Sequence, residues 1–143
     1  MAVLMKLFSR RSRMLPPLAV AVMLWLGLLS RADQAMGQPA TTIKMNDTPP
    51  AFEPSRATIK VGQTVTWVNA GATVHDASDS PAIAIKASDV ASPAKAVVFD
   101  SGFLQPGASF SYTFTVPGVY KYVCLPHEAA GMVGEITVEP GKS

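Results

Sequence analysis

Apolar and polar residues alternate in short segments along most of the chain, a pattern typical of strands that bury one face. The clearest segment is 109–116, where aromatic and aliphatic residues at even positions share one face and serines and threonines occupy the other. Gly62-Gln63 and Pro117-Gly118 are expected to break the pattern as turns. Strands are predicted at 42–45, 57–61, 64–69, 109–116, 119–124 and 134–138.

Short strands separated by regular turn signals predict an all-β fold, a β-sandwich. Segment 119–124 is expected to run straight back from segment 109–116. Pro49, Pro50 and Pro54 indicate a loop or a sheet edge, because proline cannot donate a hydrogen bond to a central ladder. Segment 76–95 is rich in Ala, Ser, Asp and Pro, and we expect a mostly irregular excursion with at most a short helix or irregular strand.

Residues 1–37 predict a secretory signal peptide. A basic start with four Lys and Arg precedes the apolar run 14–29, and Ala35-Met36-Gly37 offers small residues for cleavage before Gln38. An uncleaved membrane anchor is the alternative, although the run is short for a spanning helix. Ser9-Arg10-Arg11 resembles the start of a twin-arginine signal, so the export route is either that one or Sec. We expect a periplasmic or otherwise exported protein.

Residues 38–143 are the expected mature domain, and their charge differs from that of the whole chain. Five of the twelve Lys and Arg and one of the ten Asp and Glu precede Gln38, which leaves seven and nine, a net charge near −2. Because this domain has no basic stripe, we expect no nucleic-acid partner. Its length suits one domain with its own core.

Candidate chemistry lies in the stretch 124–132, which we call the ligand loop. It contains Cys124, the only cysteine of the chain, together with His127 and Met132. Their thiolate, imidazole and thioether are soft or borderline metal donors. A strand would direct positions three apart to opposite faces, and Pro126 and Gly131 would be out of place in a helix. We therefore expect a loop that gathers the three donors.

His75 lies far upstream and could complete this donor set. Each candidate has an ordinary alternative: a buried thiol, a methionine in the core, or a hydrogen-bonded surface histidine. The combination favours a metal site, because it uses every Cys and His of residues 38–143. Structural zinc favours several cysteines, and calcium and magnesium favour oxygen donors, whereas copper accepts all three donor types. We expect one copper ion, held by His75, Cys124, His127 and Met132.

These residues resemble the plastocyanin branch of the cupredoxins, which are small exported blue-copper electron carriers. A cysteine and a histidine three apart, followed by a methionine five further on, is the plastocyanin spacing. The resemblance spans about 43–138, and it is carried by Phe52-Glu53-Pro54, 61–69, His75, Pro117-Gly118-Val119-Tyr120 and the ligand loop.

The resemblance implies a Greek-key β-sandwich with one type 1 copper. His75, Cys124 and His127 would lie in the trigonal plane and Met132 would be the axial ligand. The chain departs from the family at Asp76, which stands where plastocyanins usually have an asparagine that pins the ligand loop.

The implied function is transport of single electrons between redox proteins by Cu(I)/Cu(II) cycling. We expect no enzyme activity and no small-molecule substrate, because copper enzymes need further histidine clusters and both histidines are committed here. The alternative is a periplasmic copper-binding protein for copper delivery or resistance. Such proteins tend to carry Met- and His-rich tracts, which residues 38–143 lack.

His127 is the expected exposed edge through which electrons pass. A small apolar patch around it, suited to brief docking, would consist of Leu125, Pro126, Ala129, Ala130 and Gly131. A cytochrome, a dehydrogenase or a membrane electron-transport complex fits as donor or acceptor, and we expect a monomer.

Overall fold

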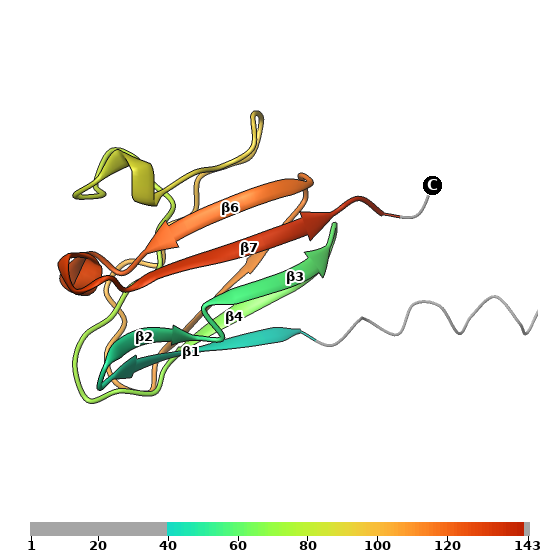
Figure 1. The fold of residues 1–143 in the computed structure, drawn as a ribbon. Helices are drawn as coiled ribbons and strands as arrows, with labels where there is room; N and C mark the ends of the chain where they lie inside the picture. Colours follow the sequence, from blue (N-terminus) through green and yellow to red (C-terminus); the bar gives the residue numbers. More distant parts are fainter. Residues whose placement is uncertain (1–39, 142–143) are drawn as a thin grey trace, which may run out of the picture. The chain divides into compact units, whose positions relative to one another are not determined.

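The structure is a computed structural model that describes residues 40–141. The predicted signal peptide, residues 1–37, lies outside the described residues. Two β-sheets make up the described part, which confirms the predicted all-β sandwich (Figure 1). One sheet contains, in spatial order, β2 (Pro50–Glu53), β1 (Thr41–Asp47), β4 (Thr64–Asn69) and β5 (Ser109–Thr113). The other contains β3 (Arg56–Lys60), β7 (Val133–Glu139) and β6 (Gly118–Val123).

Both sheets mix parallel and antiparallel pairs. Strands β1 and β4 are parallel, as are β3 and β7, whereas β1–β2, β4–β5 and β6–β7 are antiparallel. Because β5 and β6 belong to different sheets, the chain crosses the sandwich at Pro117-Gly118. Segment 119–124 follows 109–116 as the next strand, as expected, but the two strands do not pair with each other, because they lie in different sheets.

Alternation within each strand matches the two faces of the sandwich. In β4, Val65 and Trp67 are completely buried, and the threonines at 64 and 66 are partly exposed. Regular pairing of β5 ends at Thr113, earlier than predicted, because Phe114 instead exchanges backbone hydrogen bonds with the turn at Gly62 and Gln63. Strand β2 begins at Pro50 and lies at a sheet edge, one of the two settings that Pro49, Pro50 and Pro54 indicated.

The space between the sheets is filled mainly by aromatic rings. Trp67 of β4 packs against Phe99, with ring centroids 5.1 Å apart, and against Tyr122 of β6 in an edge-on contact at 5.4 Å. Phe114 contacts Tyr120 at 4.8 Å. These rings span both sheets, so their packing sets the distance between them.

Segment 76–95 is irregular, as expected, with one short 3-10 helix, η2 (Ala87–Asp89). Isolated bridges from Ser78 and Ala91 hold it beside β6. Asp79 links the first part of this segment to its last part and to the residues that follow. Its buried carboxylate accepts hydrogen bonds from the hydroxyl of Ser92 and, at 2.7 Å, from the backbone N–H of Phe99. The segment is thus fixed by specific bonds although it lacks regular structure.

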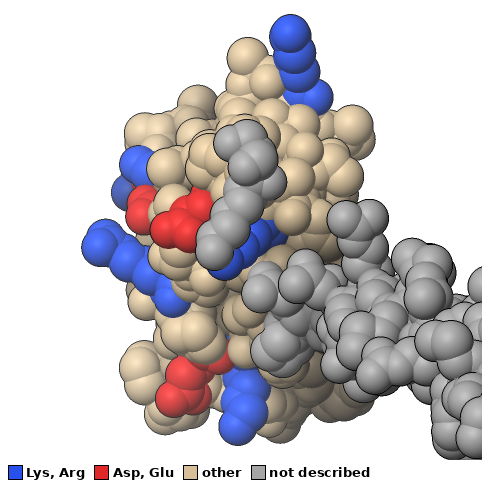
Figure 2. Space-filling model, turned by 90° about the vertical axis from the view of Figure 1, so that its right-hand side faces the viewer, with Lys and Arg blue, Asp and Glu red and all other residues tan. Residues whose placement is uncertain are grey.

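The face shown in Figure 2 carries Lys and Arg side chains close to Asp and Glu side chains, without a stripe of one sign. Within residues 40–141, no helix has the length and apolar character needed to cross a membrane.

Candidate metal centre

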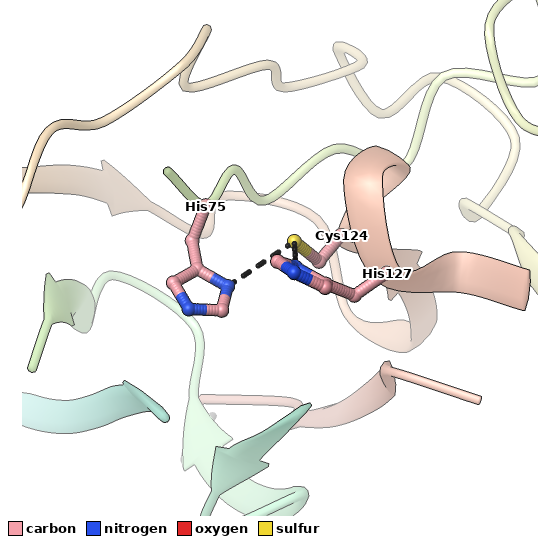
Figure 3. A group of neighbouring side chains, drawn as sticks. All are labelled: His75, Cys124 and His127. Carbon is pink, nitrogen blue, oxygen red and sulfur yellow. Dashed lines mark hydrogen bonds between the residues drawn. The ribbon is translucent and has the colours of Figure 1, made fainter. Parts of the chain in front are cut away.

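Two imidazole rings and one thiol converge at one end of the sandwich. One potential ligand atom from each of His75, Cys124 and His127 lies within 4.8 Å of the other two (Figure 3). The Nδ1 atoms of His75 and His127 lie 3.5 and 3.4 Å from the Sγ of Cys124. His75 and Cys124 are fully buried, while His127 is partly exposed. These are three of the four residues that the sequence predicts as ligands.

The ligand loop is closed by its own backbone bonds. Cys124 donates its N–H to the carbonyl of Met132 at 3.1 Å, and Met132 donates to the carbonyl of His127 at the same distance. His127 in turn donates to the carbonyl of Cys124 at 3.0 Å. Met132 is 1 % exposed. The fourth predicted ligand is therefore buried, and its backbone bonds to two of the other three.

The loop is more helical than predicted. Residues Leu125–Ala130 form a 3-10 helix, η3, which begins directly after Cys124. Pro126 is compatible with it because a proline in the first turn lacks only an N–H that would have no helical partner. Gly131 ends it in the left-handed conformation, with φ 86°, which suits glycine. The argument that these two residues exclude a helix is thus wrong, since they occupy its two ends.

His75 reaches the site from the other sheet, beyond the end of β4. Its backbone forms a two-bond bridge with Leu104, at 3.2 and 2.7 Å. Asn69, the last residue of β4, donates from its side-chain amide to the carbonyls of Thr73 and Leu104. On the imidazole, Nε2 lies 2.8 Å from Oδ1 of Asp47. The ring is therefore held from both its backbone and its outer nitrogen.

Asp76 connects the two halves of the site. Its backbone N–H points at the Sγ of Cys124 at 3.5 Å, and its Oδ1 accepts the N–H of Leu125 at 2.6 Å. The carboxylate therefore pins the ligand loop, the role that the resemblance assigns to an asparagine at this position. The departure at this position preserves the link and adds a buried acid, 1 % exposed.

Burial dominates the electrostatics of the donors. It raises the pKa of the Cys124 thiol to about 12, and the charge of Asp76 adds to the rise. Burial also raises the pKa of Asp76 to about 6, against the lowering effect of the Leu125 N–H, and it lowers the pKa of His127. Hydrogen bonds from Thr73, Ala72 and His75 hold the pKa of Asp47 well below its usual range. The imidazole of His127 is thus neutral near pH 7, the form that binds metals.

Comparison with known proteins decides the family. The model of the copper-binding proteins of the plastocyanin/azurin family matches residues 39–139. The chain belongs to this family. It is a cupredoxin, as the resemblance of its sequence indicated, and its expected cofactor, copper, is the metal of the family.

Individual relatives agree. This cupredoxin is 42 % identical to the plastocyanin of Scenedesmus fuscus over 90 residues, which cover 62 % of this chain and 86 % of that one. It is 31 % identical to the plastocyanin of Prochlorothrix hollandica over 137 residues, 94 % of this chain and all of that one. A solved structure of a reduced amicyanin variant superposes with a TM-score of 0.54 at 28 % identity, covering 76 % of this chain and 88 % of that one.

Two residues of the site were missed by the sequence reasoning. Asp47, which contacts His75, stands 28 positions before it, and nothing in the strand pattern marks it. Glu128 lies in the ligand loop but was not singled out, and its carboxylate accepts the backbone N–H groups of Ile85 and Lys86 in the 76–95 segment. Both residues make polar contacts with segments that are distant in the sequence, and the local pattern of apolar and polar residues does not predict such contacts.

Proposed function

We propose that His75, Cys124, His127 and Met132 hold one copper ion and that the protein is an exported one-electron carrier. The convergence of two imidazole nitrogens and a thiol sulfur within 4.8 Å carries the proposal. A set of two imidazoles, one thiolate and a weak thioether is that of blue-copper electron-transfer sites. Copper bound there would alternate between Cu(II) and Cu(I) and so store one electron.

The chain's own residues favour this role over catalysis. The donors sit on a loop closed by its own hydrogen bonds, linked by Asp76 to the segment that carries His75. Such a framework can keep its geometry while the charge at its centre changes. Both histidines of the chain belong to the site, so no further imidazole is left to activate a substrate.

The simplest test is optical. Purified protein mixed with Cu(II) should turn intensely blue, and ascorbate should bleach the colour reversibly. A thiolate bound to Cu(II) gives this absorption, whereas a copper store built on other donors does not need it. A protein that binds Cu(II) without the colour would instead support copper delivery or resistance, and one that does not bind copper would refute both functions.

We further propose that the partner docks over His127. Pro126, Ala129 and Ala130 are exposed around this partly exposed ring, and Leu125 is partly exposed beside it. The one acid of the helix, Glu128, is 4 % exposed, so its charge is withdrawn from the surface. An uncharged, apolar surface suits a short-lived complex with another redox protein, such as a cytochrome, a dehydrogenase or a membrane complex.

Leu125→Lys should slow electron transfer from a protein donor, with ferrocytochrome c as the probe in stopped-flow measurements. Its blue spectrum and its reduction by ascorbate should equal those of the unmodified protein, because Leu125 is not a ligand. Lys44→Leu, on β1, is the control for a change of charge and size elsewhere. Unaltered transfer from ferrocytochrome c would remove the docking proposal and leave the copper site intact.

A further inference from the structure

Asp47 lies at the end of β1, on the far side of the His75 ring from Cys124. One ring nitrogen of His75, Nδ1, faces the Sγ of Cys124 at 3.5 Å, and the other points away from it (Figure 3). This outer nitrogen, Nε2, lies 2.8 Å from Oδ1 of Asp47. The Asp47 carboxylate therefore contacts the predicted ligand His75 at the ring nitrogen that faces away from the site. Asp47 is not itself one of the four predicted ligands.

The Asp47 carboxylate is held in place by its surroundings. Oδ2 accepts the backbone N–H of Ala72 at 2.5 Å, and Oδ1 accepts the hydroxyl of Thr73 at 2.6 Å in addition to His75. Gly71 leaves the room for this approach, because a Cβ there would overlap the carboxyl group. Three donors and a glycine thus fix a side chain that is only a quarter exposed.

These contacts determine where the proton of the His75 ring lies. A neutral imidazole has one N–H donor and one acceptor nitrogen, and an ionised carboxylate can only accept. The hydrogen bond to Asp47 therefore places the proton on Nε2 and leaves the lone pair of Nδ1 directed at the site. A carboxylate in this position also raises the basicity of the ring and adds a negative charge that favours the more highly charged metal ion.

We propose that Asp47 is a positioning residue of the copper site, which selects the ring tautomer of His75 and favours Cu(II) over Cu(I). The proposal rests on the proposed function, because it assumes copper at these donors. A purely structural role is the competing explanation: the same three hydrogen bonds would simply hold segment 71–75 against β1. The two explanations differ in what they predict for the reduction potential.

Three variants separate them. Asp47→Ala removes both the acceptor and the charge, and Asp47→Asn keeps a side-chain oxygen for Nε2–H but removes the charge. Gly71→Ala keeps the charge and forces the carboxylate to move. Glu53→Gln is the control: it removes one negative charge from β2, the neighbour of β1, and Glu53 makes its side-chain bond to Asn46 rather than to His75.

Copper affinity is measured by competition with a chelator, and the potential by redox titration. Loss of such a partner typically weakens metal binding 10–100-fold, so we expect a loss in that range for Cu(II) in Asp47→Ala and a smaller one in Asp47→Asn. A tenfold larger loss for Cu(II) than for Cu(I) raises the potential by about 59 mV. Gly71→Ala should resemble Asp47→Ala, and Glu53→Gln should equal the unmodified protein.

Nuclear magnetic resonance of the metal-free protein gives a readout that does not depend on copper. The Nε2–H proton of His75 should be visible and slow to exchange in the unmodified protein, and it should disappear in Asp47→Ala. Folded variants, judged by near-ultraviolet circular dichroism, with unchanged affinity and potential would overturn the proposal. A colourless copper complex of the unmodified protein would refute the proposed function instead, which is a separate result.

Discussion

Glu128 fastens the 76–95 segment to the ligand loop, and its removal gives the sharpest test of the architecture around the site. Its two carboxylate oxygens accept the backbone N–H groups of Ile85 and Lys86, each at 2.8 Å, and the residue is 4 % exposed. Glu128→Ala removes both bonds. We expect a less stable protein with a loosened 81–86 segment.

The magnitude follows from the two bonds. A hydrogen bond to a charged group contributes about 1.5–3 kcal/mol. Ile85 is 64 % exposed, so water can bind the released N–H groups in the variant, and the total loss is reduced. We expect Glu128→Ala to lower the free energy of unfolding by about 2 kcal/mol, a factor of roughly 30 in the folded-to-unfolded ratio. Glu128→Gln should lose about half, because only its carbonyl oxygen can still accept.

The assay is urea unfolding of the metal-free protein combined with hydrogen exchange at Ile85 and Lys86. Glu139→Gln, an exposed acid at the end of β7, is the matched control and should stay within about 0.5 kcal/mol of the unmodified protein. The blue colour should survive in Glu128→Ala, because the ligand loop is closed by its own backbone bonds. An unchanged urea midpoint with unchanged exchange at both amides would refute the reasoning.

Two other perturbations probe the packing and the buried charge. Gly134→Ala should destabilise the protein by about 1–3 kcal/mol, seen as a lower Tm, because its Cβ would overlap the ring of Tyr122; Gly141→Ala, with open space around it, should change little. Burial raises the pKa of Asp79, so this acid binds its proton more tightly in the folded than in the unfolded protein. Its contribution to stability should therefore fall as pH rises from about 3.9, the unfolded pKa, through the folded pKa. The difference in unfolding free energy between the unmodified protein and Asp79→Asn should follow this trend from pH 4 to 7, and a constant difference would contradict it.

Most strands could be predicted because their signal is local. Strand β4 occupies the predicted residues, since alternating Val65 and Trp67 must face the core while the threonines face outward. The pairing of strands is a different matter, because it depends on contacts between distant segments. The alternation of apolar and polar residues did not predict the parallel pairs β1–β4 and β3–β7. It also did not predict that the chain crosses between the sheets from β5 to β6.

The candidate site divides in the same way. Its donors could be predicted because rare side chains at a fixed spacing carry the chemistry themselves. Asp47 and Glu128 are common surface residue types, and their roles arise only when β1 meets the 71–75 segment and when the 76–95 segment folds back on η3. The spacing of residues within one segment does not predict such contacts between distant segments.

The distance between His75 and Cys124 is a distance across the sandwich. His75 follows β4 in one sheet, whereas Cys124 follows β6 in the other, and between the two strands Trp67 packs edge-on against Tyr122. Asp76 and the bridge between Ser78 and Val123 join the two sides close to the donors. Because close-packed protein interiors resist deformation, we infer that the core, rather than the metal, sets the separation of the donors. An electron carrier needs donor positions that are set by the protein, since its ligands must stay in place while the charge between them changes.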